Sequence, residues 1–402
     1  MRSSLEGQAG FCGANRRQTS YFPCAMRDLR VTQAISWVHV GDLHMDEADQ
    51  WLAEGRLRRI VDEVNRFMSR DVDFVFLPGD NANHATADQY AAIVDALSPL
   101  TIPYRVIPGD HDFEEKTLEG YRAAFDEACR PEVEVLAGHR CIFVDIVSAG
   151  SGGPDFRLTM HDRNRLAEEL SRAEAEGQTP IVFMHAYPDD LAADGDAIAQ
   201  MFADARVAFV DTGHTHYNEL LNDGRVVYGA TRSTAQIEEG GGVPGFSVVS
   251  VYDRVPSWRF KTLDGDWPFV QIVAPADLRM VTRPADPRQV PRPGPVEIVA
   301  KVFGDNVAPV TARHEDGAAV PMERGADGLW RATLMLSAGH HDVAVTAGQD
   351  RDAISLLVRD TDDIPRRGAP VALGSAMHAV GAWPQRGIEG TQLGPNRNGR
   401  HW

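Results

Sequence analysis

Residues 73–80, DFVFLPGD, and residues 104–112, YRVIPGDHD, share one pattern, an apolar run that ends in Pro-Gly-Asp. A short apolar run bounded by turn residues is typical of a buried strand. Each run therefore predicts a strand whose carboxyl end presents an aspartate, Asp80 in the first and Asp110 in the second. In open α/β sheets, ligands bind beyond the carboxyl ends of the strands. These two carboxylates are therefore candidate functional groups.

Three further apolar runs also lead into polar side chains suited to a metal ion. Residues 34–40 lead into Asp42-Leu43-His44, and residues 180–184 lead into His185. Residues 207–210 lead into Gly213-His214-Thr215-His216. Residues two apart in an extended segment point to the same side, so the aspartate and histidine of the first motif can converge on one cation, as can both histidines of the last. Each motif alone is compatible with a solvated turn or a core histidine. Their joint appearance in this order favours a shared site.

Together, the strand ends supply four histidines and three carboxylates, namely Asp42, His44, Asp80, Asp110, His185, His214 and His216. Mixed imidazole and carboxylate ligands favour Mn²⁺, Fe or Zn²⁺ over Mg²⁺ or Ca²⁺. So many ligands exceed the needs of one tetrahedral ion, and they suit two ions about 3.5–4 Å apart if one carboxylate bridges them. We therefore expect two divalent or mixed-valence transition-metal ions (Mn, Fe or Zn).

The remaining patterns predict an α/β domain followed by a small all-β domain. Helical periodicity is present at 52–69, 86–97, 160–175 and 195–204, and further strands are expected at 141–147, 225–229, 246–252 and 257–261. Short strands separated by turns are expected after the prolines of 283–295, at 296–302, 310–314, 330–336, 342–346 and 354–358. The predicted division is a poorly ordered leader (1–33), an α/β domain (34–282), a Pro-rich linker (283–295), a β-sandwich (296–360) and an extended tail (361–402).

Composition limits the classes of partner. The net charge of −18 argues against nucleic acid, because an acidic surface repels the phosphate backbone. No run approaches the roughly 20 apolar residues that span a bilayer, so no membrane is expected. The four cysteines form no C-x-x-C pair, which argues against a disulfide scaffold or a cysteine zinc site. No secretory signal is apparent in the first 35 residues, and we expect a cytoplasmic protein.

At this point, the chain resembles the calcineurin-like metallophosphoesterase superfamily over about residues 34–262. That family carries D-x-H, GD, GNH-[DE], H and G-H-x-H along the chain. The matches are Asp42/His44, Gly79-Asp80, Gly109-Asp110-His111-Asp112, His185 and Gly213-His214-Thr215-His216. The resemblance implies a four-layer αββα sandwich of two mixed sheets flanked by helices. The C-terminal strands, with Trp330 as an anchor, look like an immunoglobulin-like β-domain.

The resemblance also implies a role for each matching residue. Asp80 would bridge the two ions, His111 would lie near the leaving group, and Asp112 would orient His111. The remaining ligands would divide into Asp42, His44 and His216 on one ion, and Asp110, His185 and His214 on the other. A hydroxide activated by the metal pair would attack the phosphate ester in line, and His111 would protonate the departing alkoxide.

One residue departs from the family pattern, and the substrate remains open. Asp110 stands where the family usually has asparagine. It is either a true ligand in a variant subgroup or the mark of an altered second metal position. A phosphodiesterase acting on a small molecule, such as a cyclic nucleotide or other small diester, is the leading hypothesis. A phosphomonoesterase or protein phosphatase and a non-catalytic metal-binding interaction module are the alternatives, and the sequence does not determine the oligomeric state.

Overall fold

The computed structural model describes residues 34–237, 242–305, 309–315 and 317–360. The predicted leader and C-terminal tail lie outside these residues. The described chain falls in one compact unit that begins at Gln33. Among the described residues, no helix is long and apolar enough to cross a membrane.

The first sheet contains the strand that leads to Asp42. Its order is β11-β10-β1-β2-β3, with β1, β2 and β3 parallel and with β10 and β11 antiparallel to their neighbours. The strands are β1 (Ala34–His39), β2 (Phe74–Leu77), β3 (Tyr104–Val106), β10 (Gly245–Tyr252) and β11 (Val255–Thr262).

The second sheet has the order β4-β5-β6-β7-β9-β8, and β5, β6, β7 and β9 are parallel. The edge strands β4 and β8 are antiparallel to their neighbours. The strands are β4 (Val133–Leu136), β5 (His139–Val144), β6 (Thr179–Met184), β7 (Phe209–Thr212), β8 (Glu219–Asn222) and β9 (Val227–Ala230).

Aromatic side chains fill the space between the two sheets. Trp37 of β1 stacks on Phe74 with ring centroids 5.9 Å apart, and its edge meets Phe183 of β6 at 5.3 Å. The opposite faces of the strands carry Val38 and Val182, which belong to the core shared with the helices. Because both faces of these strands are buried, the sequence shows continuous apolar runs rather than alternation.

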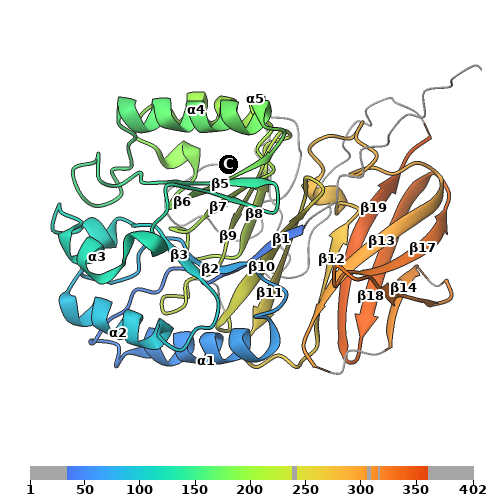
Figure 1. Cartoon of the computed structure of the whole chain (residues 1–402), viewed down its shortest axis with the longest axis horizontal. Helices are drawn as coiled ribbons and strands as arrows, with labels where there is room; N and C mark the ends of the chain where they lie inside the picture. Colours follow the sequence, from blue (N-terminus) through green and yellow to red (C-terminus); the bar gives the residue numbers. More distant parts are fainter. Residues whose placement is uncertain (1–33, 238–241, 306–308, 316, 361–402) are drawn as a thin grey trace, which may run out of the picture. The chain divides into compact units, whose positions relative to one another are not determined.

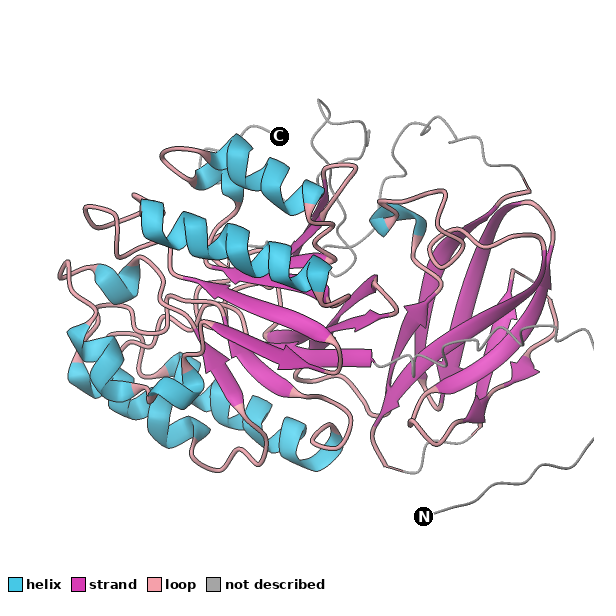
Figure 2. Ribbon diagram, turned by 45° about the horizontal axis from the view of Figure 1, so that its top comes forward, coloured by secondary structure: helices cyan, strands magenta, loops and turns pink. Residues whose placement is uncertain are grey.

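Helices cover the outer faces, and Figure 1 shows α1 and α2 on one side of the sheets and α4 and α5 on the other. These four layers confirm the predicted αββα architecture. Figure 2 shows the same arrangement coloured by type of element. The α-helices are α1 (Leu52–Phe67), α2 (Ala87–Leu97), α3 (Glu119–Ala124), α4 (Met160–Ala175) and α5 (Gly195–Asp204), and short 3-10 helices lie at His111–Phe113, Glu127–Cys129, Pro188–Asp190 and Leu278–Met280.

Two further sheets share a separate core and form the expected C-terminal β-sandwich. One sheet has the order β12-β13-β17-β16 and the other β15-β14-β18-β19. The strands are β12 (Phe269–Ala274), β13 (Gly294–Phe303), β14 (Val310–His314), β15 (Val320–Pro321), β16 (Glu323–Arg324), β17 (Trp330–Leu336), β18 (Gly339–Ala347) and β19 (Asp350–Val358).

The boundary between the two parts differs from the predicted one. Strand β12 lies inside the predicted α/β domain, 34–282, but it pairs with β13 and contributes Val270 and Ile272 to the sandwich core. The Pro-rich segment is not a bare linker either, because Val290 is buried with Val281. Proline content marks a break in regular structure, but it does not show whether the broken segment packs.

Candidate metal centre

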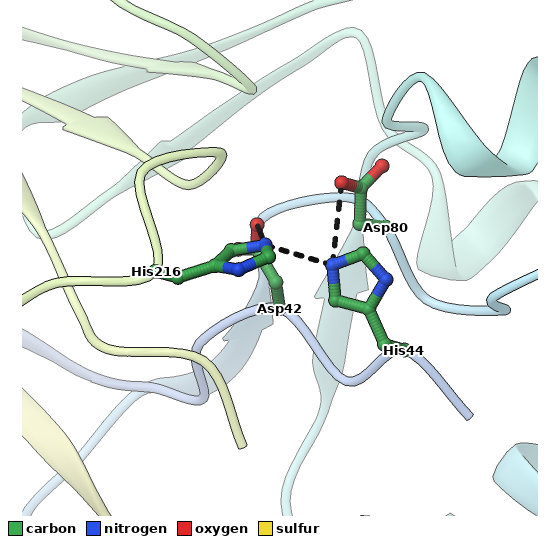
Figure 3. Close-up of side chains that lie close together, drawn as sticks. All are labelled: Asp42, His44, Asp80 and His216. Atoms are coloured by element: carbon green, nitrogen blue, oxygen red, sulfur yellow. Dashed lines mark hydrogen bonds and ion pairs between the residues drawn. The ribbon is translucent and has the colours of Figure 1, made fainter. Parts of the chain in front are cut away.

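The structure brings the seven predicted ligands together in two groups that share one residue. Within each group, one ligand atom from each residue lies within 4.8 Å of the others. Figure 3 shows the first group, in which Asp42 and His44 come from one loop and Asp80 and His216 from other loops. The groups are Asp42, His44, Asp80 and His216, and Asp80, Asp110, His185 and His214.

Asp80 is the shared residue, and its two carboxylate oxygens face different groups. Its Oδ2 lies 3.6 Å from Nε2 of His44, and its Oδ1 lies 3.4 Å from Nε2 of His185. A carboxylate whose oxygens point to two separate sets of donors can bridge two ions. The bridging role that the family resemblance implies for Asp80 requires such a geometry.

Several ligands follow their strands in a left-handed backbone conformation. The φ angles are 43° at His44, 48° at Asp80, 68° at His214 and 60° at His216. Non-glycine residues rarely adopt positive φ, and such positions cost about 1–3 kcal/mol each unless the surrounding structure enforces them. The chain therefore bends sharply at the strand ends, and each bend aims a side chain at the common point.

Glycines directly precede four of the ligands, Asp42, Asp80, Asp110 and His214, and no side chain fits at any of these glycines. A Cβ built on Gly79, whose φ is 110°, would lie 2.4 Å from Nδ1 of His185. A Cβ on Gly213 would lie 2.4 Å from Oδ1 of Asp42. The Gly-Asp and Gly-His pairs of the sequence thus allow ligands from different strands to pack closely.

Hydrogen bonds to one ring nitrogen leave the other nitrogen facing the centre. Nδ1 of His185 donates to the carbonyl of Pro78 at 2.8 Å, so in the neutral ring Nε2, which lies 3.2 Å from Oδ1 of Asp110, carries the lone pair. Nδ1 of His44 contacts Oδ1 of Asn83 at 3.1 Å, and its Nε2 faces His216. Such partners fix the tautomer and orientation of metal-ligating histidines.

The pKa shifts of the carboxylates and imidazoles at the centre suit a site where bound cations can replace protons. Burial opposes the ionised form of Asp80, but the imidazoles of His185, His44 and His111 outweigh burial and hold its pKa well below the usual range. Burial also opposes the imidazolium of His185, yet the Asp80 carboxylate raises its pKa well above the usual value. Burial lowers the pKa of His216 to about 4, which leaves a free lone pair at neutral pH.

An unsatisfied atom tests whether the centre fits metal ions. Oδ1 of Asp42 is buried without a hydrogen-bond partner in the part of the chain that the structure describes, while Oδ2 accepts from the backbone N–H of His214 at 2.8 Å. A buried carboxylate oxygen without a donor is costly unless a cation meets it. The donor set of carboxylates and imidazoles therefore fits divalent metal ions, as the fold and the two groups of ligands support.

His111 and Asp112 lie beside the centre, but their relationship differs from the expected one. The backbone N–H of His111 donates to Oδ1 of Asp80 at 2.9 Å, and its ring packs edge-on to His44 with centroids 4.6 Å apart. Nδ1 of His111 donates to the carbonyl of Asn83 at 2.8 Å. The group that orients His111 is therefore Asn83 rather than Asp112.

Asp112 instead connects the loops on either side of the centre, including the one that carries Asp80. Its carboxylate accepts from the backbone N–H groups of Gly109 at 3.0 Å and Asn81 at 3.1 Å, and from the hydroxyl of Tyr90 at 2.9 Å. Nδ2 of Asn81 at 2.9 Å and the backbone N–H of Ala82 at 3.3 Å also donate to this buried carboxylate, and among the described residues it has no hydrogen bond to His111. The prediction that Asp112 orients His111 is corrected accordingly.

Sequence reasoning missed two residues that shape the centre. Asn83 holds both His44 and His111, and Phe156 meets the ring of His214 edge-on with centroids 4.8 Å apart. The position of Asn83, three residues after Asp80, was a usable signal. No local pattern marks Phe156, since it reaches the centre from the glycine-rich loop before α4.

Comparison with known proteins agrees with this geometry. Residues 36–218 match the family model described as calcineurin-like phosphoesterase, and all seven ligand positions lie within that range. The chain is similar to a "probable cyclic nucleotide phosphodiesterase" of Fibrobacter succinogenes, with 22% identity over 236 residues that cover 55% of this chain and 86% of that protein. A "probable cyclic nucleotide phosphodiesterase" of Ruthia magnifica shares 25% identity over 79 residues, covering 20% of this chain and 34% of that protein.

Among solved structures, a dimetal phosphatase from Danio rerio is similar with a TM-score of 0.45 and 12% identity, covering 58% of this chain and 98% of that chain. The family match and the two groups of ligands point in one direction. Residues 36–218 therefore match the calcineurin-like phosphoesterase family, and this match together with the two groups of ligands supports a metal-dependent phosphoester hydrolase.

Proposed function

We propose that the protein hydrolyses a small phosphate diester of the cyclic-nucleotide class at a centre of two metal ions. The observation that carries this proposal is the position of Asp80 between two complete groups of ligands. One of its two oxygens faces each group, and His111 lies beside them. The relatives named as probable cyclic nucleotide phosphodiesterases support the class of ester. The proposal goes beyond them in assigning the residues.

The proposed ligands of the first ion are Asp42, His44 and His216, and those of the second are Asp110, His185 and His214, with Asp80 shared. Mn, Fe and Zn suit these mixed donors better than Mg or Ca. When bound, the two ions supply a water of lowered pKa and neutralise charge on the phosphoryl oxygens. From the composition of the chain, we also propose a cytoplasmic location and no nucleic-acid or membrane partner.

His111 is the proposed general acid. Burial opposes its imidazolium, but the carboxylate of Asp80 and the carbonyl of Asn83 raise its pKa above the usual value. An imidazolium held by Asn83 through Nδ1 has Nε2–H as the remaining donor. That proton can pass to the departing alkoxide oxygen, which a small diester with a poor leaving group requires.

The test is a comparison of esters with the full chain reconstituted in Mn²⁺, Zn²⁺ or Fe²⁺. We expect turnover of a 3′,5′-cyclic nucleotide and of bis(p-nitrophenyl) phosphate, with kcat/KM for the monoester p-nitrophenyl phosphate lower by about tenfold or more. A preference for the monoester would replace the proposal by a phosphomonoesterase. Full metal occupancy without turnover of any ester would favour the non-catalytic module.

A further inference from the structure

A second kind of histidine and carboxylate cluster lies in the C-terminal β-sandwich. It consists of His314, the last residue of β14, the adjacent Glu315, and His341 of β18, which we call the sandwich triad. One ligand atom from each of the three side chains lies within 4.8 Å of the others. The triad lies outside residues 36–218, the part of the chain that matches the phosphoesterase family.

The register of the sheet brings the two histidines together. His314 is paired with Val343 in the antiparallel ladder of β14 and β18, and His341 precedes Val343 by two residues. Residues two apart on a strand share a face, so the histidines are diagonal neighbours on one side of the sheet. Their rings meet edge-on, with centroids 6.0 Å apart and planes at 84°.

Glu315 joins this face because the backbone turns at that position. In a regular strand, its side chain would point to the face opposite His314. Its φ is 44°, in the left-handed region, and its N–H donates to the carbonyl of Asp342 at 2.8 Å. This turn places Oε1 of Glu315 3.4 Å from Nδ1 of His341.

The triad continues the row of side chains that forms the sandwich core. Val310 and Ala312 of β14 and Val343 and Val345 of β18 are buried in that core. Since His314 and His341 follow the same alternation, they close its end. Only 10% of the His341 side chain is exposed, whereas 56% of the Glu315 side chain reaches solvent.

One buried ring nitrogen of each histidine in the triad has no hydrogen-bond partner among the described residues. Nδ1 of His314 and Nδ1 of His341 are both shielded from solvent and unbonded. The other nitrogen of His341, Nε2, lies 2.9 Å from the carbonyl of Ser337 and donates its hydrogen there. This bond selects the tautomer in which Nδ1 presents a lone pair, as in histidines that bind metals through one nitrogen and a carbonyl through the other.

A lone pair directed at a carboxylate is repulsive unless a proton or a metal ion lies between them. The separation of His341 and Glu315, 3.4 Å without a hydrogen bond, resembles the N···O separations in the dinuclear centre. There, His214 lies 3.5 Å from Asp110 and His216 lies 3.7 Å from Asp42. Converging donors around a metal produce such distances.

We propose that His314, Glu315 and His341 bind one transition-metal ion of the zinc class. Two imidazoles and one carboxylate are the donors that Zn²⁺ and Fe²⁺ accept, and three protein ligands leave a position for water. The ion ties the end of β14 to β18 and stabilises the sandwich by mass action. The site is separate from the dinuclear centre and does not depend on its activity.

The experiment counts zinc ions bound by the full chain. Metal-free wild-type protein and a His341→Ala variant are dialysed against Zn²⁺ alone, and bound metal per chain is measured by mass spectrometry. His340→Ala is the matched control, because His340 is exposed and, by strand alternation, lies on the other face of β18. We expect the wild type and His340→Ala to bind one equivalent more than His341→Ala, with equal phosphoesterase turnover in all three.

Equal zinc content in the wild type and His341→Ala would overturn the proposal. If His341→Ala does not fold, Glu315→Gln decides the question, because this largely exposed side chain can change without loss of core packing. The expected result for Glu315→Gln is an affinity of one site reduced by at least about tenfold, with the other sites unchanged. Unchanged affinity at every site would refute the triad as a metal site.

Discussion

The dinuclear centre and the sandwich triad use the same kinds of side chain but are built in different ways. The centre collects residues that follow several strands of two sheets, and Asp80 joins its two halves. The triad comes from two adjacent strands of a single sheet, where register and one left-handed residue, Glu315, create the cluster. The first depends on the fold of a whole domain and the second on one pair of strands.

This difference also separates the electrostatics of the two places. At the centre, carboxylates and imidazoles are buried together and shift one another's pKa values strongly, as at Asp80 and His185. In the triad, the carboxylate of Glu315 is largely exposed. A buried and crowded set of charges holds ions tightly and can do chemistry, whereas a half-exposed set is suited to a single ion that secures structure.

Among the substitutions that test this comparison, Asp80→Asn is expected to have the largest effect on metal binding and turnover. The change removes the one charge that both groups share, so both ions of the centre should bind at least about 100-fold more weakly. Turnover should fall by about 10³-fold because the preorganised charge around the reacting phosphate is lost. Metal analysis and ester hydrolysis measure the two effects.

The triad supplies an internal reference for that variant. Zinc bound at His314, Glu315 and His341 should remain in Asp80→Asn, so the protein should keep one equivalent while it loses two. Full retention of all ions in this variant would contradict the bridging role of Asp80.

The next largest effect is expected from His111→Ala. His111 is not among the ligands of either group, so metal content should stay at the wild-type level. The loss of a positioned general acid should reduce kcat by about 10²-fold or more for a cyclic nucleotide, whose alkoxide is a poor leaving group. Kinetics on esters of graded leaving-group pKa measure the effect.

A contrast between substrates provides the control for His111→Ala. Bis(p-nitrophenyl) phosphate has a leaving group that needs little protonation, so its turnover should fall much less. Equal losses on both substrates would show that His111 supports the centre structurally and not as an acid.

The sequence predicted the α/β part of the fold well because its signals are local. Helices α4 and α5 have the predicted bounds, and the strand-end motifs mark the centre, because every ligand follows an apolar run within a few residues. The edge strands β4 and β8 escaped prediction because Glu134 in the first, and Glu219 and Asn222 in the second, interrupt the apolar run. Residues 269–274 of β12 were not predicted as a strand and were included in the α/β domain, because pairing with β13 is a long-range choice.

At both sites, the contacts that the sequence did not predict depend on how separate segments pack together. The role of Asn83 depends on which way its carbonyl and side chain point, and this follows from packing against His44 and His111. No local pattern joins His314 to His341, because their approach requires the strand register. Motifs in one segment can be read from sequence, whereas contacts made by register cannot.

The smallest effect is expected from Asp110→Asn, which restores the residue usual in the family. The substitution keeps an oxygen that can bind the second ion, but it removes one of the three carboxylates and gives the centre the triad's ratio of two imidazoles to each carboxylate. We expect the second ion to remain with an affinity lower by about tenfold, and the acidic limb of the kcat profile to move to lower pH, because a less negative centre favours a deprotonated nucleophile. Asp110→Ala is the matched control, since it removes the oxygen and should release the second ion. If Asp110→Asn also released that ion, the negative charge at Asp110, and not its oxygen, would be the feature that holds the second metal. The centre would then differ from the triad, because it would need all three of its carboxylates.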